Sequence, residues 1–441
     1  MSKTMKRTLL PLRLLAAGLL GLAAGSASAA GMITHASMAD FGRDALEDGP
    51  LKTILTAHRP ALLAGAIYPD GGYASGALFP DDRNMAERAH WGDFVIEFIK
   101  YLREIGCVGE VQAALIRRPP LGTIDLNQLS DRCGHLIAFA FGDAAHGLTD
   151  ETWDAQFEPE VRHRGEDPNP ALFLDQLPLS LPAPLREVLV QAFAATPMNA
   201  IEYAMDVVNV SERRLHLDAP TLVFPPAADL AIVYSRTASS QAPVTEAAIQ
   251  RGNLTARTLV QAEIAGASAD LVRVRRQMPW AAANYYTAPG GVVQSGYAVA
   301  GMYRQLWDLL TGDPARPLAP AVVASYPGHG ALDVVLEPAH DGWTQHRWLH
   351  VFFSSSMDAA SLELPGAICL FDPEGRRVAG RVEAGSWQRD YSHPAKFRLE
   401  QALRPGQRYT LVVTPKAKDW RGTPLARSHS FSFVTAGATT P

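Results

Sequence analysis

The sequence contains little cysteine and lacks the short motifs that identify several common hydrolases. It has 3 cysteines among 441 residues and no C-x-x-C pair, which disfavours a thiolate zinc site and thioredoxin-like redox chemistry. It contains no G-x-S-x-G, H-E-x-x-H or P-loop motif, which disfavours a serine hydrolase, a zincin protease and a P-loop nucleotidase. Any catalysis has to come from another arrangement of side chains.

Two further absences limit the partners. After the N-terminal region there is no run of about 18 apolar residues, so no transmembrane segment is predicted. Lysine and arginine form no block or stripe, and the formal charge is −5, which disfavours nucleic acid as a partner. The 47% hydrophobic content is ample for two domains with their own cores.

The first 29 residues have the pattern of a secretory signal peptide. Lys3, Lys6 and Arg7 precede an interrupted apolar run at residues 9–24, and residues 27–29 are small, as at a cleavage site. Cleavage there removes four cations and no acid, changing the formal charge from −5 to −9. We therefore expect a secreted or periplasmic protein. In that compartment Cys107 and Cys133 can form a disulfide, which leaves one cysteine free.

An apolar helix followed by spaced polar residues lies at 136–154. His146, Asp150 and Asp154 are four residues apart, so on a helix they form one ridge. Such a pair is often only a surface ion pair. The preceding turns, however, are apolar nearly all round, which indicates a buried helix whose His and Asp need partners, and a divalent metal satisfies both.

Five other residues are candidates for the same site. His35 falls in the first turn of the first helix after the signal peptide, and Asp70 follows an apolar helix that Pro69 is expected to end. His90 is expected at the start of another helix. Glu202 and Asp206 lie four apart on a helix at residues 200–208. The ordinary alternatives are a turn residue for Asp70, a capping histidine for His90 and a solvated stripe for the two acids.

Taken together, these residues resemble a known family. Four blocks occur in its order: Thr34-His35, residues 64–70, His90-Trp91, and residues 138–146 followed by Asp150. They resemble the bacterial zinc-dependent phospholipase C family, in particular the catalytic domain of glycosylphosphatidylinositol-specific phospholipase D. The resemblance covers roughly residues 31–210 and implies an all-helical fold with a zinc cluster that hydrolyses phosphate esters.

The resemblance also implies the ligands. Asp70, His90, His146 and Asp150 match those of one zinc, and His35, the mature amino terminus and a bridging Asp150 match those of a second. Imidazole and carboxylate suit Zn²⁺, and two close metals can clamp a phosphodiester and activate a bridging water. Asp70 is also placed to orient that water or accept its proton.

The chain departs from the family at the third metal. Asp154 stands where a His is expected, and Glu202 with Asp206 stand where a His and an acid occur. A set of carboxylates suits Ca²⁺, Mg²⁺ or Mn²⁺ better than Zn²⁺. We therefore expect two zinc ions and, at most, a labile third cation.

From residue 320 short β-branched and aromatic runs recur between turns, which predicts a β-sandwich over residues 320–436. Its motifs resemble bacterial immunoglobulin-like modules, which are usually spacers or binding modules. Residues 372–375 are expected to join strands 368–371 and 376–382 as a hairpin. His346 and His350 are expected to be edge or surface histidines. A helical domain over residues 30–314 is expected to fold without this sandwich.

Three functions remain open: a secreted phospholipase C or D acting on a phospholipid or lipid anchor, with transient membrane contact; a nucleotide phosphodiesterase or nuclease of the same fold; and a non-catalytic cell-surface binding protein. The acidic balance disfavours the nuclease. The altered third site is the argument for the binding protein.

Overall fold

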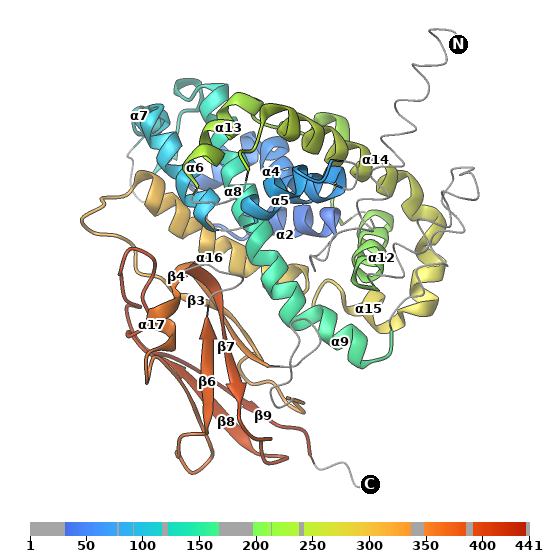
Figure 1. The fold of residues 1–441 in the computed structure, drawn as a ribbon, viewed down its shortest axis with the longest axis vertical. Helices are drawn as coiled ribbons and strands as arrows, with labels where there is room; N and C mark the ends of the chain where they lie inside the picture. The colour runs from blue at the N-terminus through green and yellow to red at the C-terminus, as the bar shows by residue number, and fades with distance from the viewer. Residues whose placement is uncertain are drawn as a thin grey trace.

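The computed structural model describes residues 31–437, except 77–78, 91, 117–121, 167–196, 213, 238–241, 337–347 and 385–390. The N-terminal part is helical and the C-terminal part is an antiparallel β-structure, as the sequence predicts, and in Figure 1 the sandwich lies below the helices. The signal peptide, Trp91 and His346 lie outside the described residues. Within the described residues, no helix is long and apolar enough to cross a membrane.

The helical part surrounds one long central helix, α8. Its helices are α2 (Met32–Asp44), α3 (Pro50–Ala57), α4 (Arg59–Gly76), α5 (Asp82–Ala89), α6 (Gly92–Glu104), α7 (Cys107–Ala114), α8 (Asp131–Thr152), α9 (Glu158–His163), α12 (Pro197–Ser211), α13 (Ala227–Arg236), α14 (Glu246–Gln277), α15 (Pro279–Asn284) and α16 (Val292–Thr311). Short turns of 3-10 helix at Leu126–Gln128 and Ala219–Thr221 and a two-stranded ribbon, Leu115–Ile116 with Thr123–Ile124, complete it.

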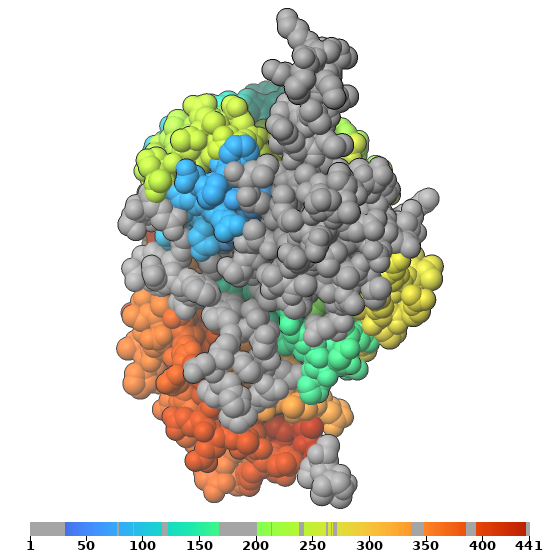
Figure 2. All heavy atoms as spheres, turned by 45° about the vertical axis from the view of Figure 1, so that its right-hand side comes forward, coloured from blue at the N-terminus to red at the C-terminus, as the bar shows by residue number. Residues whose placement is uncertain are grey.

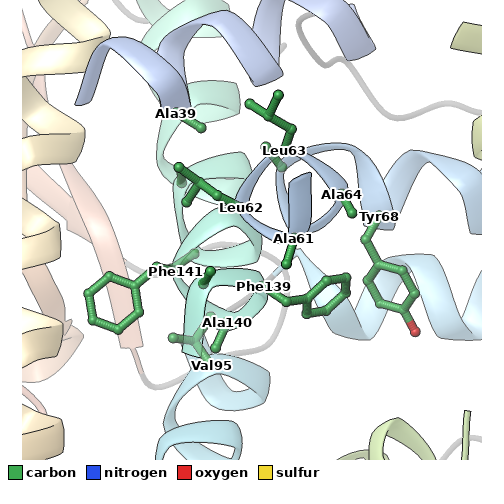
Figure 3. Packing of buried hydrophobic residues seen from close by; sticks show 14 of the residues in the cluster. Ala39, Ala61, Leu62, Leu63, Ala64, Tyr68, Val95, Phe139, Ala140 and Phe141 are labelled. Carbon is green, nitrogen blue, oxygen red and sulfur yellow. The ribbon is translucent and has the colours of Figure 1, made fainter. Parts of the chain in front are cut away.

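Helix α8 is buried over most of its length because its sequence is apolar on nearly every side. Ser130 begins it by accepting a hydrogen bond from the Cys133 amide, as an N-cap does. Helix α4 crosses α8 so closely that a Cβ on Gly142 would lie 1.9 Å from the Leu62 carbonyl oxygen, and one on Gly65 would lie 2.1 Å from that of Phe139. Figure 3 shows the aromatic and aliphatic side chains that fill the space around this crossing.

Two expected helix boundaries are wrong. Helix α4 continues through Pro69 to Gly76, so Asp70 lies on the helix and not in a turn after it. The buried packing of α4 on α8 outweighs the local preference of proline to end a helix. His90 is the C-cap of α5, and α6 begins only at Gly92. Its imidazole is therefore held at a helix end rather than a helix start.

A disulfide joins Cys107 and Cys133, the pairing that the sequence allows, and Cys369 is free and buried. The bond links α7 to the first turn of α8. It therefore ties the entry of the central helix to the helix that precedes it in the chain.

The sandwich consists of two antiparallel sheets around its own apolar core. In the first sheet the strands lie in the order β3 (Val322–Tyr326), β4 (Leu349–Asp358), β7 (Tyr391–Leu399), β6 (Gly380–Ala384). In the second the order is β5 (Ile368–Phe371), β8 (Arg408–Val413), β9 (His429–Val434). A short helix, α17 (Ala359–Glu363), connects β4 to β5 along the chain. The expected hairpin forms only next to its turn at residues 372–375: Phe371 bridges Arg377, and the Val378 amide donates to the Leu370 carbonyl oxygen at 2.8 Å. Beyond that point β5 pairs with β8 and β6 with β7. The reversal moves the chain from one sheet to the other.

The sandwich packs tightly on the helical part. Ala324 of β3 and Phe352 of β4 belong to the apolar core of the helices, and a Cβ on Gly301 of α16 would lie 2.5 Å from Val323. Buried Lys396 of β7 lies near Glu151 of α8. Burial lowers the pKa of Lys396 to about 8, although the carboxylate of Glu151 raises it. In Figure 2 the orange and red atoms of the sandwich lie directly below the helical part. The sandwich therefore shares a core with the helices.

Candidate metal centre

The structure brings together five of the predicted residues from four segments. Helix α2 carries His35, α4 carries Asp70, the end of α5 carries His90, and α8 carries His146 and Asp150. Among the described residues, two groups have ligand atoms all within 4.8 Å of one another: His35, His146 and Asp150, and Asp70, His90 and His146. His146 belongs to both groups and is fully buried.

Each imidazole directs its Nε2 atom into the centre. His90 Nε2 lies 2.9 Å from His146 Nε2. Asp150 Oδ2 lies 3.4 Å from His90 Nε2 and 3.5 Å from His146 Nε2. Asp70 Oδ1 lies 3.7 Å from His146 Nε2. His146 Nε2 thus lies within 3.7 Å of an atom of each of the other three residues.

The opposite nitrogen of each ring is anchored. Nδ1 of His146 contacts the Ala66 carbonyl oxygen at 2.8 Å, and Nδ1 of His90 contacts the Ala86 carbonyl oxygen at 2.8 Å. Because a carbonyl only accepts, both rings carry their proton on Nδ1 and direct a lone pair from Nε2.

His35 is anchored through Thr149. Its Nδ1 lies 2.6 Å from Thr149 Oγ1, whose own proton goes to the His146 carbonyl oxygen. Thr149 Oγ1 therefore accepts from His35, which again leaves the Nε2 lone pair free to face Asp150 Oδ1, at 2.9 Å. Anchors of this kind fix the tautomer and orientation of metal-binding histidines.

Burial disfavours charge throughout the centre. It raises the pKa of Asp70 to about 8. The imidazole of His35 lowers this pKa, whereas the nearby carboxylates of Asp150 and Asp206 raise it further. Burial lowers the pKa of His146 well below its ordinary value, and the other two imidazoles lower it further. His146 is thus neutral.

These residues fit a divalent metal. Two Nε2 lone pairs facing each other at 2.9 Å repel unless a metal ion or a shared proton lies between them. Ligands about 2.0–2.2 Å from a tetrahedral Zn²⁺ are roughly 3.3–3.6 Å apart. His146 Nε2 lies 2.9–3.7 Å from His90 Nε2, Asp150 Oδ2 and Asp70 Oδ1, and His90 Nε2 lies 3.4 Å from Asp150 Oδ2. Asp150 directs Oδ2 to this group and Oδ1 to His35, which is the arrangement of a carboxylate that bridges two metals.

The three acids predicted for a third metal lie in neither group of the described residues. Asp154 follows α8 in a π-helical turn, η2 (Trp153–Phe157), so the regular ridge of His146 and Asp150 stops before it. Buried Glu202 and Asp206 lie on α12. Asp206 accepts hydrogen bonds from the first turn of α2, where Ile33 N and Thr34 N lie 3.0 and 2.8 Å from its oxygens.

Sequence reasoning missed three residues around the centre. Thr149 anchors His35; Asn209, one helical turn after Asp206, donates to Ser37 Oγ at 2.6 Å; and Glu263 of α14 hydrogen-bonds to Asp206. Glu263 had a detectable signal, because it interrupts an apolar stripe that includes the buried residues Val260 and Ala267. Thr149 and Asn209 had none, since either fits an ordinary polar helix face. His135 packs against the ring of His58.

Comparisons with known proteins identify the C-terminal part. Residues 317–435 match the family model of the bacterial Ig-like domain. The predicted immunoglobulin-like module is confirmed.

For the helical part the comparisons give a weaker relation. A segment of 142 residues is 29% identical to phosphatidylinositol-glycan-specific phospholipase D of Mus musculus, covering 31% of this chain and 14% of that protein. The chain therefore spans only a small share of this relative's length. Two solved structures of the bacterial S-layer protein SbsC cover 89% and 88% of this chain and 46% and 79% of theirs, at 14% and 13% identity with TM-scores of 0.21. TM-scores this low do not establish a common fold.

Proposed function

We propose that the protein is a secreted, metal-dependent phosphoric ester hydrolase that acts on a phospholipid or a lipid anchor, as a phospholipase C or D. The observation that carries the proposal is the pair of Nε2 lone pairs of His90 and His146 facing each other at 2.9 Å, because they need a cation between them. The partial similarity to a phosphatidylinositol-glycan-specific phospholipase D supports the lipid substrate.

The ligand set suits zinc better than harder cations. Three imidazoles and two carboxylates converge, and borderline-soft Zn²⁺ prefers nitrogen-rich sites, whereas Mg²⁺ and Ca²⁺ prefer oxygen. Two zinc ions sharing Asp150 would be held by His90, His146 and Asp70 on one side and His35 on the other. When bound, they supply a charge clamp for the phosphodiester and acidify a water molecule.

The side chains of this chain have distinct tasks in that reaction. Asp70 directs Oδ1 to His146, which leaves Oδ2 to orient the attacking water and take its proton. Thr149, Ala66 and Ala86 hold the three imidazoles in one tautomer through their Nδ1 atoms. Asp150 directs Oδ1 to His35 and Oδ2 to His90, so its carboxylate reaches both proposed metal positions.

A secreted location agrees with three observations. The N-terminal pattern is that of a signal peptide, the Cys107–Cys133 disulfide suits an oxidising compartment, and bacterial Ig-like domains match the C-terminal part. The sandwich packs on the helical part, and we propose that it holds this part in shape at the cell surface or outside the cell.

Substrate screening of the zinc-loaded protein tests the proposal. We expect hydrolysis of phosphatidylinositol, phosphatidylcholine or glycosylphosphatidylinositol in vesicles, abolished by Asp150→Asn. The products are a phosphorylated head group with a phosphate-free lipid for C-type cleavage, or a phosphate-free head group with a phosphatidic acid for D-type cleavage. Product analysis by mass spectrometry distinguishes cleavage on the two sides of the phosphate. Turnover of bis-nucleotide esters without lipid turnover would identify a nucleotide phosphodiesterase. Tight lipid binding without turnover of either class would identify a binding protein.

A further inference from the structure

The carboxylate of Asp206 is buried between three helices and makes an unusually complete set of hydrogen bonds. Its Oδ2 accepts from the Ile33 amide at 3.0 Å, and its Oδ1 accepts from the Thr34 amide at 2.8 Å and from Thr34 Oγ1 at 2.6 Å. Asp206 is 1% exposed, so no water replaces these donors. Three acceptor positions of one carboxylate are thus used by the first turn of a single helix, α2.

Glu263 of α14 lies beside Asp206. Its side chain hydrogen-bonds to Asp206, and burial beside that carboxylate raises the pKa of Glu263 well above its ordinary value. Two carboxyl groups can share a hydrogen bond only through a proton, and Glu263 keeps it because Asp206 already has three donors. An ionised carboxylate accepts about four hydrogen bonds. With three donors from α2 and the hydrogen bond of Glu263, Asp206 is satisfied without a metal.

The first turn of α2 is held by a second contact from α12. Asn209 donates to Ser37 Oγ at 2.6 Å and to the Tyr285 hydroxyl at 2.7 Å, and that hydroxyl lies 3.3 Å from Thr34 Oγ1. A Cβ on Gly31 would lie only 2.5 Å from Asp206, so the chain approaches the carboxylate as closely as glycine permits. His35 directly follows the two residues that Asp206 binds.

We propose that Asp206 and Glu263 are positioning residues for His35: they fix the first turn of α2 so that the imidazole faces Asp150, and they hold no metal themselves. The negative charge of Asp206 at the N-terminus of α2 also stabilises that helix through its dipole. The inference rests on the proposed metal centre and assigns it two metal positions, with Asp206 outside both. Any cation held by Asp154 and Glu202 has to do without it.

Titration of Co²⁺ into the chelator-stripped full chain tests this assignment, because the visible spectrum of Co²⁺ reports both the number of ions and their ligands. In Glu263→Gln the amide still donates to Asp206, so we expect the wild-type number of ions and near-wild-type affinity. In Asp206→Asn we expect the same number of ions, with the ion at His35 bound about 10- to 100-fold more weakly, as for other groups that orient metal ligands. Asp229→Asn is the control for a general loss of stability. Asp229 is also a buried carboxylate, but it lies on α13 and accepts a hydrogen bond from Arg132.

Loss of one whole Co²⁺ ion in Glu263→Gln or Asp206→Asn would identify a metal ligand and overturn the proposal. An unchanged affinity in Asp206→Asn would also overturn it. If Asp206→Asn does not fold, Thr34→Val and Thr34→Ser test the proposal instead. Thr34→Val should lower the affinity for the Co²⁺ ion at His35, and Thr34→Ser should keep it near the wild-type value. Equal affinities in these two variants would contradict the proposal. A wild-type chain that binds no Co²⁺ would refute the proposed metal centre itself, which is a different result from any of these.

Discussion

Buried histidines occur in both parts of the molecule, yet their surroundings differ completely. His146 in the helical part is surrounded by two imidazoles and by the carboxylates of Asp70 and Asp150. His350 in the sandwich, expected at a surface, is 3% exposed and lies between the rings of Trp348 and Phe352. Burial alone thus does not mark a metal ligand; the convergence of carboxylates does.

The difference follows from how each ring is satisfied. His350 Nδ1 contacts the Trp348 carbonyl oxygen at 3.1 Å, and burial lowers its pKa to about 3, with the positive charge of Lys396 acting in the same direction. A neutral ring between two aromatic rings is a stable core residue. His146 is also neutral, but its Nε2 faces another lone pair and two acids. Only the second arrangement requires a cation.

The largest contrast is expected between His146→Ala and His350→Phe. His146 is shared by both ligand groups, so alanine should abolish tight zinc binding and reduce ester hydrolysis at least about 10³-fold, through the loss of several kcal/mol of charge stabilisation. His350→Phe should leave the zinc content unchanged. Metal analysis of both purified variants makes the comparison, and equal zinc loss in the two would contradict it.

Removal of the sandwich tests how separate the two regions are. The sequence suggests that a chain ending at Pro314 folds alone, but Ala324 and Phe352 complete the helical core beside α16. The shortened chain should therefore expose apolar side chains of α16 and aggregate or melt at a clearly lower temperature than the full chain. Size-exclusion chromatography and a thermal melt measure this, and a monomer with the full-length melting temperature would show that the shared core is dispensable.

A smaller loss is expected from Gly142→Ala at the crossing of α4 and α8. The added Cβ would meet the Leu62 carbonyl oxygen at 1.9 Å, so the helices must separate, at a cost of about 1–3 kcal/mol or more, and Nδ1 of His146 must move away from Ala66. Gly109→Ala is the matched control, because its Cβ meets nothing within 4 Å and alanine should favour helix α7 by about 0.5–1 kcal/mol. Opposite signs in chemical denaturation are expected; a neutral Gly142→Ala would contradict the close crossing.

The smallest effect at neutral pH is expected from His350→Phe, and it should grow in acid. The folded-state pKa of His350, about 3, lies below its ordinary value of 6.5. The unfolded chain therefore binds the proton first, and the wild type loses stability as the pH falls from about 6.5 towards 3. The phenylalanine variant lacks this proton, so its stability should fall less over that range. Parallel urea-denaturation curves at pH 7 and pH 4.5 test the difference, and equal pH dependence would show that the ring is not held neutral.

The sequence predicts the helical part and the sandwich, because each leaves a local pattern, and it allows the disulfide without deciding it. The residues that converge on the centre are predicted through the order of the blocks that resemble a known family. The sequence misplaces Asp70 and His90 relative to helix ends, since tertiary packing of α4 on α8 overrides the local preference of Pro69. The role of Asp206 is also invisible in the sequence: its partners in α2 are more than 170 residues away. Long-range hydrogen bonds of this kind have no periodic signature.

Anomalous diffraction at the zinc edge from crystals of the zinc-loaded full chain tests the central claim most directly. We predict one peak about 2.0–2.2 Å from Nε2 of both His90 and His146, shared with Asp150, and a second at the same distance from Nε2 of His35. Imidazoles in the observed positions with no peak between them, or zinc bound only elsewhere, would contradict the metal centre.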